Sequence, residues 1–186
     1  MTNTAGLTLW FTGLPSAGKS TLAQLLARKL SDVGVRVEVL DGDLVRAALS
    51  SELGYSKADR DANIQRIGYL SQLLSRNGVV VVVAAISPYQ EMRRKIRQNH
   101  GSIPFVEIFV DCSLEVRVKR DVKGLYQKAL RGEIQNFTGI SDPYEAPENP
   151  EIIVHTDRQT PEESVCHIFT ALREIVPREI LPFDTR

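Results

Sequence analysis

The sequence predicts an α/β fold, in three layers, with helices on both faces of a five-stranded parallel sheet. Short apolar segments alternate with stretches of helical periodicity, and a glycine-rich loop joins the first segment to a helix. Such alternation is typical of parallel sheets, whose strands are covered on both faces. We expect ligands at the carboxyl ends of the strands. The expected strands are Leu7–Thr12, Val35–Leu40, Val79–Ala85, Phe105–Val110 and Ile152–His155, with the very apolar Val79–Ala85 at the centre.

The overall composition limits the class of protein. The chain has 186 residues, of which 42% are apolar, and a formal net charge of +0. This length suits one domain, residues 1–186, and the charge gives no reason to expect nucleic acid or an anionic membrane as a partner. No apolar run has the length of a membrane span, and the first residues do not resemble a secretion signal. Cys112 and Cys166 lack metal-binding spacing, so we expect reduced thiols and a cytoplasmic location.

The loop from residue 13 to residue 20 gives the most specific chemical signal. Its sequence, GLPSAGKS, matches the phosphate-binding pattern G-x-x-x-x-G-K-[ST], and a chance glycine-rich turn would rarely match it between a strand and a helix. Glycines let backbone N–H groups approach phosphate oxygens, which also face the positive end of the following helix. Lys19 should reach the β- and γ-phosphates, and Ser20 should bind Mg²⁺. The expected nucleotide contacts are Gly13, Leu14, Pro15, Ser16, Ala17, Gly18, Lys19, Ser20 and Thr21.

Polar residues follow the second and third expected strands. The motif Asp41-Gly42-Asp43 is compatible with a plain turn. Beside the phosphate loop, the alternative is that one of its carboxylates binds Mg²⁺ through water or accepts a proton. Ser87 precedes a proline, which favours extended backbone, and Pro88 suits the first turn of a helix. Ser87 is therefore either the N-cap of that helix or a substrate contact.

The helices have recognisable ends. Ser56 and Asp59 resemble a capping box, which should start a helix that runs to about Asn77. Asn63 and Arg66 should lie on one side of this helix. They form either a polar, solvated face or part of a site. A final helix should start after Thr160 and run to about Val176. The basic run formed by Arg93, Arg94, Lys95 and Arg97 is interpreted as a solvated helix face.

The segment from Lys123 to Pro150 is unusual. It combines glycines and prolines with Tyr126, Phe137 and Tyr144, so it is too broken for one helix and too aromatic for a flexible linker. We interpret it as an active-site lid, the alternative being a long surface loop, which is uncommon in a compact domain.

In their order, these motifs resemble those of the adenylylsulfate kinases, a family of P-loop kinases. The matching blocks are residues 13–20, 41–43, 63–68, 86–89, 120–126, 137–140 and 142–147. The resemblance covers roughly residues 6–172, and the blocks after the phosphate loop are its more specific part. It implies transfer of the ATP γ-phosphate to the 3′-hydroxyl of adenosine 5′-phosphosulfate (APS), giving 3′-phosphoadenosine 5′-phosphosulfate (PAPS) and ADP. It also implies Mg²⁺, a cytoplasmic role in sulfate assimilation, and a homodimer.

The resemblance also implies individual roles. Lys19, Asp43 and Ser87 are the expected catalytic residues, and Ser87 matches a serine described in the family as a phosphoserine intermediate. Arg120 is assigned to the ATP side. Two arginines can neutralise the phosphosulfate, an aromatic ring can stack on adenine, and Asp43 can take the hydroxyl proton. The expected acceptor contacts are Asp43, Arg46, Tyr55, Asn63, Arg66, Ile86, Ser87, Lys123, Leu125 and Phe137.

Two other functions share the phosphate loop. One is a regulatory nucleotide-binding domain without catalysis, but such domains usually have a damaged loop, whereas Lys19, Ser20 and Asp43 are all present here. The other is a kinase for a different small hydroxyl compound, such as a nucleoside or shikimate. Such kinases lack the blocks at residues 123–126 and 137–140.

Overall fold

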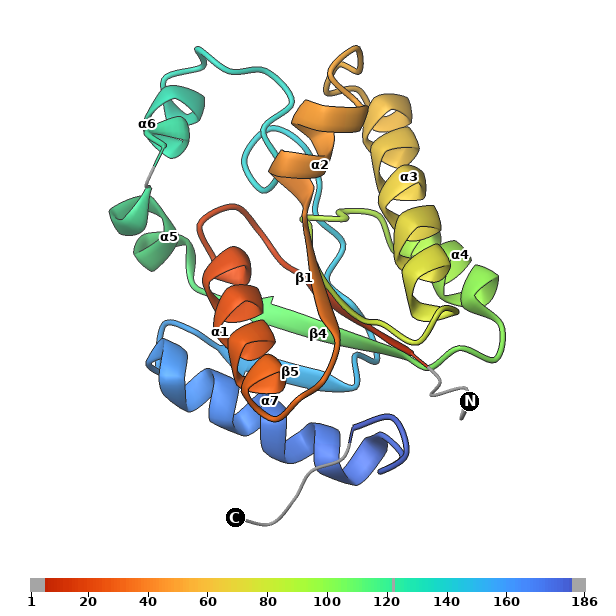
Figure 1. Ribbon diagram of the computed structural model, residues 1–186. Helices are drawn as coiled ribbons and strands as arrows, with labels where there is room; N and C mark the ends of the chain where they lie inside the picture. Colours follow the sequence, from red (N-terminus) through yellow and green to blue (C-terminus); the bar gives the residue numbers. More distant parts are fainter. Residues whose placement is uncertain (1–5, 122, 182–186) are drawn as a thin grey trace.

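A parallel sheet forms the middle layer of the molecule (Figure 1). The computed structural model describes residues 6–121 and 123–181, and within them five strands lie in the order β2-β3-β1-β4-β5. Each neighbouring pair is parallel, so every connection crosses over a face of the sheet. The predicted fold class is therefore confirmed. The strands are β1 (Leu7–Thr12), β2 (Val37–Asp41), β3 (Val80–Ala84), β4 (Phe105–Asp111) and β5 (Ile152–His155).

Helices cover both faces of this sheet. Residues of α1 and α7 pack with Leu7, Leu9 and Phe11 in one core, whereas residues of α2, α3 and α4 pack with Trp10 in a second core. Side chains alternate between the faces of a strand, so β1 contributes to both cores. The helices are α1 (Lys19–Asp32), α2 (Gly42–Leu49), α3 (Lys57–Ser75), α4 (Gln90–His100), α5 (Leu114–Arg120), α6 (Leu125–Leu130) and α7 (Pro161–Ile175). Among the residues described, no helix has the length and apolarity needed to cross a bilayer.

The central strand is β1, not β3, so the prediction that Val79–Ala85 lies at the centre was wrong. All residues of β1 and of β3 are buried. Both strands have neighbours on both edges and helices on both faces, and apolarity therefore cannot distinguish them.

The predicted helix starts at Ser56 and Thr160 are confirmed. Ser56 Oγ accepts a hydrogen bond from Asp59 N, and Thr160 forms a full capping box with Glu163. The start predicted near Ser87 was wrong, because α4 begins at Gln90 with Tyr89 as its N-cap. Ser87 has a left-handed φ of 41° rather than the extended backbone expected before a proline.

Candidate active site

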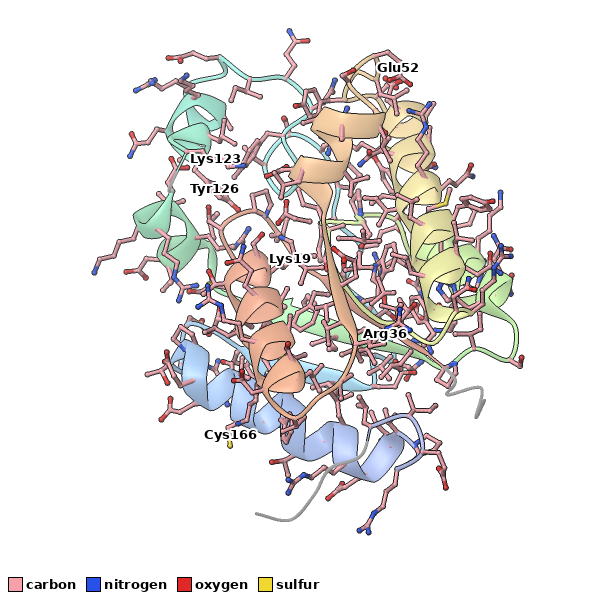
Figure 2. All side chains as sticks on the ribbon, in the orientation of Figure 1. Lys19, Arg36, Glu52, Lys123, Tyr126 and Cys166 are labelled. Atoms are coloured by element: carbon pink, nitrogen blue, oxygen red, sulfur yellow. The ribbon has the colours of Figure 1, made fainter. Side chains whose placement is uncertain are left out.

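A cavity of about 950 Å³ opens at the carboxyl end of the sheet, where ligands were expected. It is lined by the phosphate loop, the exits of β2 and β3, the first turns of α2 and α3, and the lid segment, residues 123–150. Figure 2 shows Lys19 at the start of α1, with Lys123 and Tyr126 of the lid segment above it. The chain thus brings its phosphate loop and its unusual glycine- and proline-rich segment together around one space.

The phosphate loop has the geometry that its glycines predict. Gly18 has a φ of 100°, and a Cβ at Gly13 would lie 2.5 Å from the Val110 carbonyl oxygen. Lys19 begins α1, and its Nζ donates to the Leu14 carbonyl at 2.8 Å. Burial lowers the pKa of Lys19 to about 8. Of the expected nucleotide contacts, Pro15, Ser16 and residues 18–21 line the cavity, whereas Gly13, Leu14 and Ala17 are not among its lining residues.

Oxygen ligands lie next to the loop. Ser20 Oγ donates to Asp41 Oδ2 at 2.6 Å, while Asp41 Oδ1 accepts from Asp43 N and caps α2. A hydroxyl beside a carboxylate suits Mg²⁺, which takes few protein oxygens and keeps several waters and substrate phosphates. No group of three or more His, Cys, Asp or Glu side chains that could hold a metal occurs among the described residues. Sequence reasoning expected that a carboxylate of the Asp41-Gly42-Asp43 motif could bind Mg²⁺ through water, but it named only Asp43 among the site residues.

Asp43 projects from the first turn of α2 toward the lid segment. Its carboxylate is exposed and lies 2.5 Å from Lys123 Nζ. Pairing with Asp43 raises the pKa of Lys123, so this lysine stays cationic at neutral pH. A carboxylate of α2 and an ammonium group of the lid segment, both in the lining of the cavity, therefore form an ion pair.

Most of the expected acceptor contacts line the same cavity. The Arg46 guanidinium lies 4.4 Å from the centre of the Tyr55 ring, and Phe137 packs edge-on against Tyr126. Asn63 is 7% exposed, and its Oδ1 finds no hydrogen-bond partner among the residues that the structure describes. A buried unpaired acceptor at a cavity wall suits a ligand donor. The expected contacts that line the cavity are Asp43, Arg46, Tyr55, Asn63, Ile86, Ser87, Lys123, Leu125 and Phe137.

Arg66 and Arg60 differ from expectation. Arg66 is not among the lining residues; its Nη1 lies 2.6 Å from Glu52 Oε1 and donates to the Leu49 carbonyl. Arg60, six residues earlier on α3, lines the cavity and pairs with Asp142 of the lid segment at 3.4 Å. The sequence analysis missed Arg60, although its spacing of three from Asn63 places both on one side of α3.

Ser87 is held from two sides. Trp10 Nε1 donates to its Oγ at 3.0 Å, Arg93 Nη1 donates to its carbonyl at 2.7 Å, and the residue is 1% exposed. Arg93 is itself buried and paired with Glu107 at 2.8 Å. The interpretation of the basic run as a solvated face is therefore wrong at Arg93. An arginine can lie on the buried face of a helix when a buried carboxylate neutralises its charge and backbone carbonyls accept its hydrogen bonds.

Arg120 lies on the other side of the loop. Its Nη1 and Nη2 donate to the hydroxyl and the carbonyl of Thr156 at 3.1 and 2.6 Å. Thr156 Oγ1 in turn donates to the Ala17 carbonyl, and Arg120 lines the cavity near Gly18. The placement of Arg120 beside the start of α1 agrees with a role on the nucleotide side.

Comparison with known proteins identifies the family. The family model described as adenylylsulphate kinase matches residues 5–155. The chain belongs to the adenylylsulphate kinase family. It is 55% identical to the adenylyl-sulfate kinase of a Picosynechococcus species over 170 residues, which are 91% of this chain and 95% of that protein.

Solved structures of adenylylsulphate kinases share the fold. The APS kinase of Mycobacterium tuberculosis, solved in complex with AMPPNP and APS, is 43% identical with a TM-score of 0.86, covering 91% of this chain and 98% of that chain. A hexameric APS kinase from Thiobacillus denitrificans is 35% identical with a TM-score of 0.70, covering 93% of this chain but 30% of that chain. The family's kinase fold therefore accounts for the parallel sheet and the phosphate loop described above.

Proposed function

We propose that this chain transfers the γ-phosphate of ATP to the 3′-hydroxyl of APS, giving PAPS and ADP, in cytoplasmic sulfate assimilation. The observation that carries the proposal is the single cavity that joins an intact phosphate loop to Asp43, Asn63 and Phe137. Phosphoryl transfer depends mainly on positioning and charge neutralisation, and this cavity offers groups for both.

ATP binds with its triphosphate on the loop at residues 13–20 and on the first turn of α1. Lys19 leaves the Leu14 carbonyl and contacts the β- and γ-phosphates, and Arg120 contacts the nucleotide near Gly18. Ser20, with Asp41 through water, would hold Mg²⁺, which supplies positive charge to the phosphate oxygens. In the free protein, burial lowers the pKa of Lys19. The negative charge of the bound β- and γ-phosphates raises this pKa again, so that Lys19 is fully protonated in the complex.

The acceptor binds opposite the triphosphate. Phe137 stacks on adenine, Asn63 Oδ1 accepts a donor of the base or ribose, and Arg46 neutralises the phosphosulfate. Arg60, which pairs with Asp142 in the free protein, supplies a second cation at this wall. Arg66 orders the turn at residues 49–52 through its contacts with Leu49 and Glu52, and we assign it a supporting part in acceptor binding.

In the transfer step, the 3′-oxygen forms a bond to the γ-phosphorus while the bond between that phosphorus and the β,γ-bridging oxygen breaks. The electrons of the broken bond leave on ADP, and Asp43 takes the hydroxyl proton. Lys123 neutralises charge near the γ-phosphate once the acceptor separates it from Asp43.

Ser87 acts as a positioning group rather than as a covalent acceptor. Its Oγ already accepts a hydrogen bond from Trp10, and among the described residues the other side chain that hydrogen-bonds to Ser87 is that of Arg93, a cation and not a base. A serine nucleophile needs an adjacent base. Direct in-line transfer uses groups that the cavity already provides.

The test is a coupled assay for ADP release with APS, AMP, adenosine and shikimate as acceptors. We expect APS to be used far better than the others, since Arg46 and Arg60 offer one cation each to the phosphate and to the sulfate of APS, and AMP has no sulfate. Equal phosphorylation of AMP would contradict recognition of the sulfate, and no transfer to any acceptor would favour a regulatory nucleotide-binding domain. Sedimentation of the same sample tests the homodimer that we propose as its assembly.

A further inference from the structure

We propose that the hydroxyl of Tyr126 couples the phosphate loop to the acceptor side of the cavity, so that nucleotide and APS each strengthen the binding of the other. The inference rests on the proposed function and assigns a positioning role to a residue that touches neither reacting group. Figure 2 shows Tyr126 on the side of the lid segment that lies toward the start of α1.

The Tyr126 hydroxyl makes two hydrogen bonds although the residue is fully buried. It donates to the Pro15 carbonyl at 3.0 Å and accepts from Arg117 Nη1 at 2.7 Å. Arg117 Nε in turn donates to the Cys112 carbonyl, just after β4. The hydroxyl is thus fixed between the phosphate loop and an arginine anchored beside the sheet, and movement of Pro15 changes its hydrogen bonding directly.

The ring of Tyr126 faces the acceptor side. It packs edge-on against Phe137, with ring centres 5.0 Å apart and planes at 77°. Tyr126, Ala129 and Phe137 form an apolar cluster of their own, separate from the two cores on the sheet. Displacement of Tyr126 therefore repacks the ring that we expect to stack on adenine.

A second contact joins the same two parts. Gly139 has a φ of 88°, and a Cβ there would lie 2.4 Å from Leu14 Cδ2, so the lid segment packs closely on the phosphate loop. The Leu14 carbonyl also accepts from Lys19, which must leave it to contact phosphate. Nucleotide binding thus acts on the two loop residues, Leu14 and Pro15, that contact the lid segment. Linkage requires the effect on affinity to be equal in both directions.

The test is calorimetric titration of APS into the full-length protein, with and without a non-hydrolysable ATP analogue and Mg²⁺. In the parent we expect APS to bind at least about fivefold more tightly with the analogue, the lower end of typical coupling. Tyr126→Phe keeps the ring but removes the hydroxyl, so the ratio should fall toward one. The reverse titration should give the same ratio. Tyr69→Phe, which alters an exposed tyrosine on α3, should leave the ratio unchanged.

A parent ratio of one, or an unchanged ratio in Tyr126→Phe, would overturn the proposal. If Tyr126→Phe does not fold, Leu14→Ala tests the Gly139 contact instead, and it too should lower the ratio. A purely structural role for the hydroxyl would lower the melting temperature while leaving the ratio intact. Failure of the proposed function looks different, because APS would then not bind the parent at all.

Discussion

The indole of Trp10 donates its Nε1 hydrogen to Ser87 Oγ at 3.0 Å, which ties the central strand to the segment after β3. This bond leads to the first prediction. Ser87→Ala should keep measurable turnover, with a fall in kcat of about tenfold, the effect expected for one hydrogen bond. Steady-state assays with APS measure it. Complete loss of activity, together with ³²P from labelled ATP on Ser87 of the parent, would show a covalent intermediate instead.

Arg93 should be worth far more to stability than its neighbour on α4. Arg93→Met leaves Glu107 without its closest cation and removes the donors to the Ser87 and Glu145 carbonyls. Breaking a buried ion pair typically costs about 3–5 kcal/mol of unfolding free energy. Arg94→Met, at an exposed position, should change it by less than about 0.5 kcal/mol. Urea unfolding of both variants checks this, and equal losses would refute the role of Arg93.

Phe137→Ala should weaken acceptor binding selectively. Stacking of a base on an aromatic ring is worth about 1–3 kcal/mol, so the KM for APS should rise about tenfold or more. The KM for ATP should rise less, because the phosphate loop holds the triphosphate. The matched control is Ile140→Ala, which loosens the same apolar cluster without removing a ring. An equal rise in the APS KM in both variants would mean that packing of the lid segment, not stacking, is responsible.

His100 should make stability depend on pH. Burial lowers the pKa of His100 below 6.5, and its Nδ1 and Nε2 contact the Ile96 carbonyl and the Thr8 hydroxyl. Below pH 6.5 His100 binds a proton in the unfolded chain but stays largely neutral in the folded protein, because its pKa there is lower. The unfolding free energy therefore falls as the pH falls. One such group contributes at most about 1.4 kcal/mol per pH unit.

The measurement compares the unfolding free energy at about pH 7.5 with that at about pH 5. These values lie roughly one unit or more on each side of the pKa of an ordinary histidine and so span its titration. His100→Gln should flatten the decline relative to the parent. His167→Gln, at an exposed position on α7, should retain the parent's decline. If the His100 variant also retained it, the buried imidazole would not be its source.

The sequence predicted the fold class because alternation of apolar strands with helices leaves few possible arrangements. It predicted the phosphate loop because glycines and Lys19 have a direct chemical reason to stand at that spacing. Arg93 was misinterpreted, because the sequence alone does not show whether an arginine on a helix faces water or a buried carboxylate. Arg60 and Tyr126 were not recognised as site residues, because their partners Asp142 and Pro15 are distant along the chain.

The pairing of Lys123 with Asp43 has a consequence for the speed of the catalytic cycle. Both side chains are more than half exposed, at 61% and 76%, and pairs of this kind are worth about 0–1 kcal/mol. Such a pair separates within about picoseconds to nanoseconds, as exposed side chains change rotamer. Typical kinase turnover, at about 1–100 per second, is slower by many orders of magnitude. Opening of this pair therefore does not limit the rate of the catalytic cycle, because the pair opens and closes many times within one turnover.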